Sequence, residues 1–249
     1  MNKKGKSMNA SIAEIAQSFA RDGFVVVPNL FSHAEVKVFK EEIQNILHEV
    51  RQESEGEGSQ KKFVDETGVY VGLAGRSSLF RQSVRDDRLV DILEAIIGPN
   101  VEFLSDKVVY KDEDTHIASP WHQDWPYWEG THKISVWVAL DDATPENGCL
   151  KLLPGSHRGS VIHDGDMSDG SGFGHRIRPE TIDESTAITA PVEAGGAVFF
   201  HDLTMHASHP NTERRERWTW VPTYRDAQAD DPPYSFEVAN VVVRGVGRE

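Results

Sequence analysis

The residues with the clearest potential for chemistry are a histidine and an aspartate two positions apart, His122 and Asp124. They lie in Ser119–Trp125, which reads SPWHQDW. If this segment is extended, successive side chains alternate between faces, so the imidazole and the carboxylate point the same way. Such a pair can hold one divalent metal ion, or it can be a hydrogen-bonded polar pair at a strand end.

A second group of histidines follows the apolar run Ala197–Phe200, at positions 201, 206 and 209. His201 would lie earlier on the strand than His206, and His209 would face away from His206 by alternation. Two histidines and one carboxylate occupy three positions of an octahedral metal and leave three open. That arrangement is typical of non-haem Fe(II) oxygenases.

An arginine cluster, RRER at 214–217, precedes a predicted strand at Trp218–Tyr224. Alternation puts Arg217, Thr219 and Val221 on one face and the two tryptophans on the other. A co-substrate carboxylate needs a cation deep in the fold, and a guanidinium can bind it through two parallel hydrogen bonds.

Taken together, these segments resemble the phytanoyl-CoA dioxygenase family of Fe(II)/2-oxoglutarate-dependent oxygenases. The resemblance covers roughly residues 13–225 and is most specific over 119–220. Ile134–His157 reads ISVWVALDDATPENGCLKLLPGSH and resembles the family signature W-x-A-L…NGxLxxxPGSH. Val198–Asn211 resembles the strand that carries the distal histidine of the metal site.

The resemblance implies that His122, Asp124 and His206 are the iron ligands, in preference to His201 or His209. Relatives that halogenate have a small residue in place of the carboxylate. The aspartate therefore implies hydroxylation, or a related desaturation or cyclisation, of an unactivated C–H bond.

The resemblance also implies a site for 2-oxoglutarate, which would be converted to succinate and CO2. Arg217 would bind its distal carboxylate, Ser208 would assist, and Trp137 would line the pocket. The resemblance treats Asn147-Gly148 and the PGSH turn as scaffold, so we interpret His157 as structural.

Four residues beside the metal motif are candidate walls of the substrate cavity, although aromatic residues also pack ordinary cores. They are Gln123, Trp125, Tyr127 and Trp128. The basic segment at 76–88 offers arginines that could bind a carboxylate or phosphonate, or could simply be solvated. We expect a free small-molecule metabolite, with an acyl-CoA as the alternative.

Composition narrows the function classes further. The chain has 249 residues, 26 Lys and Arg against 40 Asp and Glu, and a net charge of −14. Such a charge disfavours nucleic acid and, more weakly, a polyanionic CoA ester. The single cysteine, Cys149, excludes an internal disulfide and cysteine-rich metal sites. No apolar run approaches the roughly 20 residues that span a bilayer, so we expect a cytoplasmic monomer or homodimer.

The elements that must position these residues are helices first and short strands later. Capping and periodicity predict helices over Ser11–Ala20, from Ser32 onward, and over Asp87–Ile97. The expected strands are Phe24–Val27, Val101–Tyr110, Lys133–Leu140, Cys149–Leu153, Ala187–Pro191, Ala197–His201 and Trp218–Tyr224. We expect one domain over 1–249, with 1–10 as a flexible tail. The family resemblance makes its core a double-stranded β-helix (a cupin-like jelly roll) with the N-terminal helices packed on one sheet.

Two segments are expected to be loops. Residues 51–62 carry no apolar side chain and are predicted to be solvated, and the glycine-rich stretch 163–175 is predicted to be a mobile loop or a lid. Two rival functions stay open. A cupin-like metalloenzyme without 2-oxoglutarate would have no use for Arg217, and a non-catalytic binding protein would tolerate loss of the metal ligands.

Overall fold

The structure is a computed structural model, and it describes most of the chain in seven stretches. They are residues 10–53, 60–115, 118–128, 130–165, 175–213, 215–231 and 239–248. The predicted tail at 1–10 falls outside them except for its last residue.

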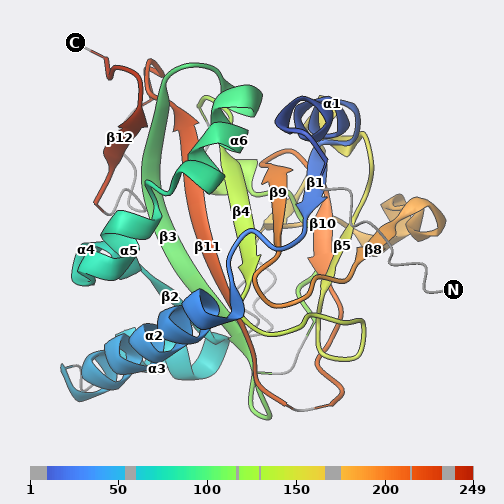
Figure 1. Ribbon diagram of the computed structural model, residues 1–249. Coiled ribbons are helices and arrows are strands. Elements are labelled where there is room, and N and C mark those ends of the chain that lie inside the picture. Colours follow the sequence, from blue (N-terminus) through green and yellow to red (C-terminus); the bar gives the residue numbers. More distant parts are fainter. Residues whose placement is uncertain are drawn as a thin grey trace, which may run out of the picture.

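The larger sheet has seven strands in the order β1-β9-β4-β11-β3-β12, with β2 paired to β3 (Figure 1). Its neighbouring strands run antiparallel throughout. The strands are β1 (Phe24–Val27), β2 (Val69–Val71), β3 (Val101–Lys111), β4 (Ile134–Ala139), β9 (Ala197–His201), β11 (Arg217–Asp226) and β12 (Val241–Arg244).

A smaller sheet has the order β10-β5-β8, also antiparallel. Its strands are β5 (Leu150–Leu152), β8 (Ile188–Ala190) and β10 (His206–Ser208). A further pair, β6 (Asp164–Gly165) and β7 (His175–Arg176), borders the stretch 166–174. The expectation of a lid at 163–175 therefore falls largely outside the described residues.

Helices come mainly from the first hundred residues. They are α1 (Ile12–Asp22), α2 (His33–Glu53), α3 (Gln60–Thr67), α4 (Leu73–Arg76), α5 (Ser78–Ser83) and α6 (Asp87–Ile97). Ser11 and Glu14 form the capping box of α1, and Ser32 and Glu35 make the same reciprocal contacts before α2. No described helix is long and apolar enough to cross a membrane.

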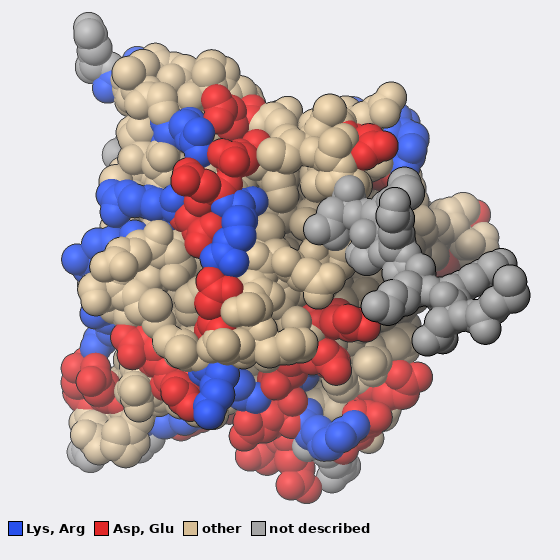
Figure 2. Space-filling model, viewed as in Figure 1, with Lys and Arg blue, Asp and Glu red and all other residues tan. Residues whose placement is uncertain are grey.

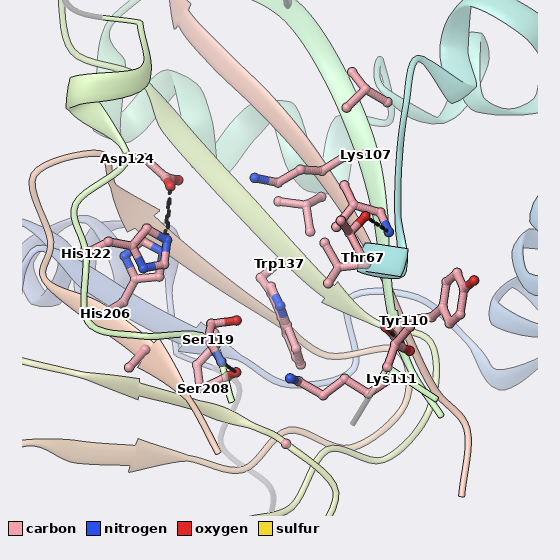
Figure 3. A pocket seen from close by; sticks show the side chains of 18 of the residues that line it. Thr67, Lys107, Tyr110, Lys111, Ser119, His122, Asp124, Trp137, His206 and Ser208 are labelled. Carbon is pink, nitrogen blue, oxygen red and sulfur yellow. Dashed lines mark hydrogen bonds and ion pairs between the residues drawn. The ribbon is translucent and has the colours of Figure 1, made fainter. Parts of the chain in front are cut away.

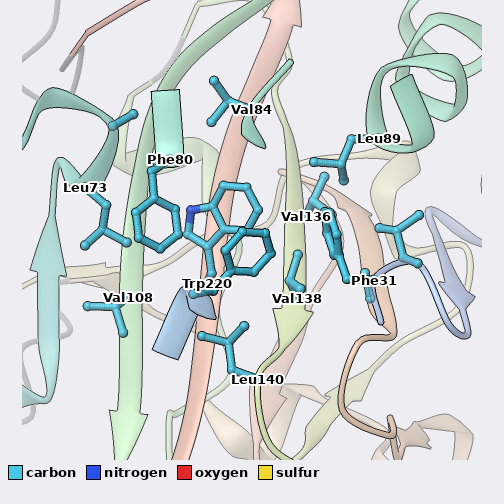
Figure 4. Close-up of a cluster of buried hydrophobic side chains, with 14 of the residues drawn as sticks. Phe31, Leu73, Phe80, Val84, Leu89, Val108, Val136, Val138, Leu140 and Trp220 are labelled. Atoms are coloured by element: carbon cyan, nitrogen blue, oxygen red, sulfur yellow. The ribbon is translucent and has the colours of Figure 1, made fainter. Parts of the chain in front are cut away.

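The helices cover one face of the larger sheet (Figure 1). The main apolar core lies between them, and Trp220 of β11 packs there against the rings of Phe31, Phe39 and Phe80 at centroid distances of 6.2, 5.5 and 5.2 Å (Figure 4). A second apolar cluster joins the two sheets and contains Trp137 from the larger one. Two antiparallel sheets face to face, with helices outside one of them, form the expected jelly roll.

Most predicted elements are confirmed, and the main error concerns the polar segment 51–62. Helix α2 continues to Glu53, and α3 begins at Gln60. The ends of that segment are therefore helical, while 54–59 lie outside the described residues. Helix α3 forms because it has one buried anchor, Val64, although its other residues are largely polar. Cys149 is buried, and burial raises the pKa of its thiol to about 11.

Candidate metal and co-substrate site

His122 and His206 come from segments far apart in the chain and lie side by side at the edge of the smaller sheet. These residues form an antiparallel bridge in which each backbone N–H donates to the other's carbonyl, at 3.0 and 2.9 Å. His206 begins β10, while His122 lies in the segment before the 3-10 turn Trp125–Tyr127. The bridge places the imidazole rings side by side, with centroids 4.1 Å apart.

Backbone carbonyls orient both rings. Nδ1 of His122 lies 2.8 Å from the Pro120 carbonyl, and Nδ1 of His206 lies 2.9 Å from the Thr204 carbonyl. Each Nδ1 can donate to its carbonyl, which leaves both Nε2 atoms as acceptors directed at Asp124. The distances from these two Nε2 atoms to Asp124 Oδ1 are 3.6 and 3.8 Å (Figure 3).

The electrostatics of the three groups suit a metal. Burial and the neighbouring His122 lower the pKa of His206 to about 3, so its imidazole is neutral at physiological pH. Burial alone would raise the pKa of Asp124, but Lys107 and the two histidines hold it well below its ordinary range. Two imidazoles and a carboxylate, with ligand atoms within 4.8 Å of one another, are a donor set that fits Fe(II).

These ligand atoms open onto a cavity of about 320 Å³ between the sheets. Arg217, Ser208 and Trp137 all line it. Arg217 is buried, its guanidinium carbon lies 5.1 Å from the centre of the Trp137 ring, and its Nε has no hydrogen-bond partner among the described residues. Burial lowers the pKa of Arg217 to about 10, so it stays charged at neutral pH.

Lys111 is a second cation at this end of the cavity, and the sequence analysis missed it. It lies opposite Arg217 in the register of strands β3 and β11, and it too is buried. Burial and the charge of Arg217 lower the pKa of Lys111 to about 7. Two adjacent buried cations repel each other, and an anionic ligand between them would relieve that repulsion.

Ser208 follows His206 by two residues on β10, and its hydroxyl accepts a 2.9 Å hydrogen bond from the backbone N–H of Ser119. This contact fixes the chain just before the metal motif. In Figure 3, Ser208 and the ammonium of Lys111 lie near the same end of Trp137.

The other histidines lie elsewhere. His201 belongs to a second cluster with His132 and Asp202, where both Nδ1 atoms lie 3.1 Å from Asp202 Oδ1. Asp202 Oδ2 accepts hydrogen bonds from the Trp128 indole and the Lys133 backbone N–H, so this carboxylate connects its own turn to the segment before β4.

His209 and His157 do not line the cavity either. Nε2 of His209 lies 3.2 Å from the Thr189 hydroxyl. The His157 ring packs on Gly23, the left-handed residue that ends α1, and a Cβ at Gly23 would lie 2.5 Å from it. A structural position of this kind agrees with our interpretation of His157.

The candidate substrate residues separate into two groups. Trp128 and Tyr127 line the cavity, whereas the structure places Gln123 and Trp125 outside its lining. The Gln123 amide is fully buried; it donates to the carbonyls of Gly159 and Leu203 and accepts from the Val161 N–H. This side chain therefore anchors loops and is not a wall of the cavity.

The basic segment at 76–88 lies on the surface. Arg76 pairs with Glu53, and Arg88 pairs with Glu35 and Asp86. Figure 2 shows basic and acidic side chains interspersed over the helical face. The cations of the cavity are instead Lys107, Lys111 and Arg217. Alternation along β3 could have identified Lys107 and Lys111, because both lie on one face of a strand that is otherwise largely buried.

Comparison with known proteins agrees with this geometry. Residues 19–218 match the model of the phytanoyl-CoA dioxygenase (PhyH) family. The chain is 27% identical over 243 residues to L-proline trans-4-hydroxylase of Streptomyces griseoviridis, covering 88% of each chain. It is 29% identical over 228 residues to ectoine dioxygenase of Stutzerimonas stutzeri, covering 82% of this chain and 73% of that protein.

Solved structures give the same result. A non-heme monooxygenase, ThoJ, superposes with a TM-score of 0.76 at 26% identity, over 93% of this chain and 84% of the other. The epimerase SnoN, in complex with Fe3+, alpha ketoglutarate and nogalamycin RO, superposes with a TM-score of 0.69 at 25% identity, over 89% and 86%.

Proposed function

The chain belongs to the phytanoyl-CoA dioxygenase family, and from that premise we propose that His122, Asp124 and His206 hold Fe(II) while Arg217 binds 2-oxoglutarate. The enzyme is an Fe(II)- and 2-oxoglutarate-dependent dioxygenase that oxidises a small molecule. One observation carries the assignment of residues. Three converging ligand atoms and a buried arginine with an unsatisfied Nε line the same cavity.

The metal ligands are preorganised by backbone contacts. Each histidine would give Nε2 to the metal, since the Nδ1 of each is engaged by a carbonyl. Such outer contacts fix the tautomer and the ring orientation before the metal arrives. Asp124 would supply Oδ1, the oxygen that already faces both rings. Its carboxylate fills the third protein position, which favours hydroxylation over halogenation.

The co-substrate would enter with its distal carboxylate toward Arg217. The guanidinium can donate in parallel to both carboxylate oxygens, and its carbon lies 5.1 Å from the centre of the Trp137 ring. Ser208 and Lys111 lie at the same end of the cavity and would contribute a hydroxyl and a second positive charge. Because these groups are buried, their attraction for a dianion is stronger than it would be in water.

When bound, Fe(II), 2-oxoglutarate and O2 supply the oxidising chemistry, in which 2-oxoglutarate becomes succinate and CO2 and one oxygen atom enters a C–H bond. The residues of the chain bind and orient these ligands and the substrate, and they exclude water from the cavity. Val109, Val221 and Phe200 give the cavity apolar walls, and Tyr127 and Trp128 line it beside the metal motif.

The substrate is a small molecule. A cavity of about 320 Å³ matches the lower end of ordinary small-molecule sites. The named substrates of the two relatives, proline and ectoine, are compact metabolites. We therefore favour a compact metabolite over an acyl-CoA, and we treat the whole chain as a single domain built around this cavity.

Anaerobic spectroscopy tests the proposal. Fe(II) and 2-oxoglutarate together should give a visible charge-transfer band in the wild type. Arg217→Met should require about 100-fold more 2-oxoglutarate for the same band, because loss of one partner of a buried charged pair costs about 2–5 kcal/mol. The matched control is Arg215→Met, since the Arg215 side chain is 81% exposed and pairs with Glu213 on the surface. A wild type without the band, or equal affinities in both variants, would overturn the assignment.

A further inference from the structure

Lys107 projects into the cavity from β3 (Figure 3). Alternation puts its side chain on the same face as that of Lys111, with about 13 Å of strand between the two residues. In Figure 3 the two ammonium groups lie on opposite sides of Trp137, and that of Lys107 lies toward Asp124. The cavity therefore has a second cation, away from the one beside Arg217.

The neighbours of Lys107 across the sheet are apolar on both sides. Val71 of β2 and Val221 of β11 are its direct partners in register, and both line the cavity. Among the described residues, no carboxylate lies within ion-pair distance of its ammonium, and no hydrogen bond satisfies it. The charge of Lys107 acts on Asp124 from beyond ion-pair distance, so this half-buried cation, flanked by valines, obtains a direct partner only from the contents of the cavity.

The metal and co-substrate leave this charge in excess. Asp124 and a bound 2-oxoglutarate dianion together carry one negative charge more than Fe(II) can neutralise. Arg217 balances that charge, and Lys107 and a protonated Lys111 are further positive charges. The carboxylates of Glu66, Asp106 and Asp114 also line the cavity, but none of them forms an ion pair with Lys107. An anionic group of the substrate would supply that partner.

Hydroxyl groups lie in the next row of the sheet. Thr223 of β11 pairs in register with Ser105 on one side and Ser135 on the other. The hydroxyls of Thr223 and Ser135 lie 3.4 Å apart, and Ser105 and Thr223 line the cavity. A carboxylate beside Lys107 would meet hydrogen-bond donors as well as a charge.

We propose that Lys107, with the hydroxyls of Ser105 and Thr223, binds a carboxylate group of the substrate, so that the enzyme acts on small carboxylic acids, amino acids included. This inference rests on the proposed function and deepens it, because it names the substrate class. One ammonium matches one monoanion. The apolar flanks would strengthen the pair by keeping water away.

The test compares matched acids and amides in binding. Mn(II) replaces iron, because it is paramagnetic and needs no oxygen-free handling, and 2-oxoglutarate is added. Line broadening of ligand protons in NMR is then measured for pairs such as L-proline and L-prolinamide. The wild type should bind the acids about tenfold or more tightly than the amides, since hydrogen bonds to charged groups have at least that effect on affinity.

Three variants test whether Lys107 causes the preference for acids. Lys107→Met keeps the side-chain stem, removes the charge and should abolish the preference, whereas Lys107→Arg should retain it. Lys37→Met is the control, because that lysine side chain is 77% exposed on α2.

Two outcomes overturn the proposal. One is equal binding of acids and amides by the wild type, including no binding of either. The other is an undiminished preference in Lys107→Met. The anaerobic Fe(II)/2-oxoglutarate band is measured on the same protein preparations, loaded with Fe(II) in place of Mn(II). A missing band contradicts the proposed function, whereas a normal band without acid preference contradicts only the role of Lys107.

Discussion

The two faces of strand β11 differ in how their polar groups are satisfied. On the face toward the helices, the Trp220 indole donates to Asp106 at 2.9 Å, and the Tyr224 hydroxyl donates to the Val84 carbonyl at 3.0 Å. On the face toward the cavity, the Arg217 Nε is buried without a partner in the described part of the chain.

This difference separates stability from function within one strand. The polar groups of the helix-facing side chains have hydrogen-bond partners inside the core, so loss of one side chain should lower the free energy of unfolding. On the cavity face, the Arg217 Nε has no hydrogen-bond partner in the described part of the chain, and a bound anion would provide one. Buried polar groups without partners are costly, so their presence here marks a binding site.

The largest effect is expected from His206→Ala, on the cavity side of the molecule. Without its Nε2 the metal loses one of three protein ligands, and turnover should fall by more than the roughly 10–100-fold that loss of an outer contact costs. Succinate formation and bound iron measure this effect. His209→Ala is the control, as its ring contacts Thr189 outside the cavity. Full activity in His206→Ala would move the metal to another histidine.

On the opposite face, Trp220→Ala should lower the free energy of unfolding by about 3–5 kcal/mol, because it empties the centre of an aromatic cluster. Urea denaturation measures the loss, and 2-oxoglutarate affinity of the folded fraction should change little. If Trp220→Ala weakened 2-oxoglutarate binding as much as it destabilised the fold, the two faces would not be independent.

The pH dependence of 2-oxoglutarate affinity tests the role of Lys111 on the cavity face, and its expected effect is smaller than that of the two substitutions above. Burial and Arg217 lower the pKa of Lys111 to about 7, and a bound dianion would raise it again. Below pH 7 the ammonium is already protonated, so affinity should be highest and constant. Above pH 7 binding must take up a proton, so affinity should fall by up to about tenfold per pH unit until the pKa of the complex is reached.

Calorimetric titration between pH 6 and pH 9 measures this slope. Lys111→Met should bind 2-oxoglutarate more weakly at pH 6 and show no such slope. An identical slope in wild type and Lys111→Met would remove Lys111 from the co-substrate site.

The smallest effect is expected from Tyr224→Phe on the helix face. It removes one buried hydrogen bond to the Val84 carbonyl and should cost about 1 kcal/mol in stability. Chemical denaturation can resolve that difference, with no change in succinate formation. A stability loss as large as that of Trp220→Ala would mean that packing is not the main contribution on this face.

The sequence predicted what depends on local patterns. The bounds of β1, β9 and α6 follow from β-branched runs, turn residues and capping, and alternation correctly divided β11 between its two faces. Strand β10 has three residues, too few for a periodicity of its own, so only the family resemblance placed His206 on a strand. Its partner across the sheet is far away in sequence, so only tertiary structure defines it.

The charged residues of the cavity were predicted unevenly for the same reason. Arg217 was found through its position after His206 in a recognised family pattern. Lys107 and Lys111 were missed because the sequence does not show the environment of a lysine on a strand. Such a lysine usually faces solvent, and it faces a cavity only when a second sheet covers that face of the strand. The arginines at 76–88 were noticed for their number, but they lie on the surface beside acidic partners.

The most direct test is a crystal structure with Mn(II) and 2-oxoglutarate bound. We expect the metal on His122 Nε2, Asp124 Oδ1 and His206 Nε2, with the distal carboxylate of 2-oxoglutarate on Arg217. A metal bound by the second cluster, His132, His201 and Asp202, with the first cluster empty, would contradict the account.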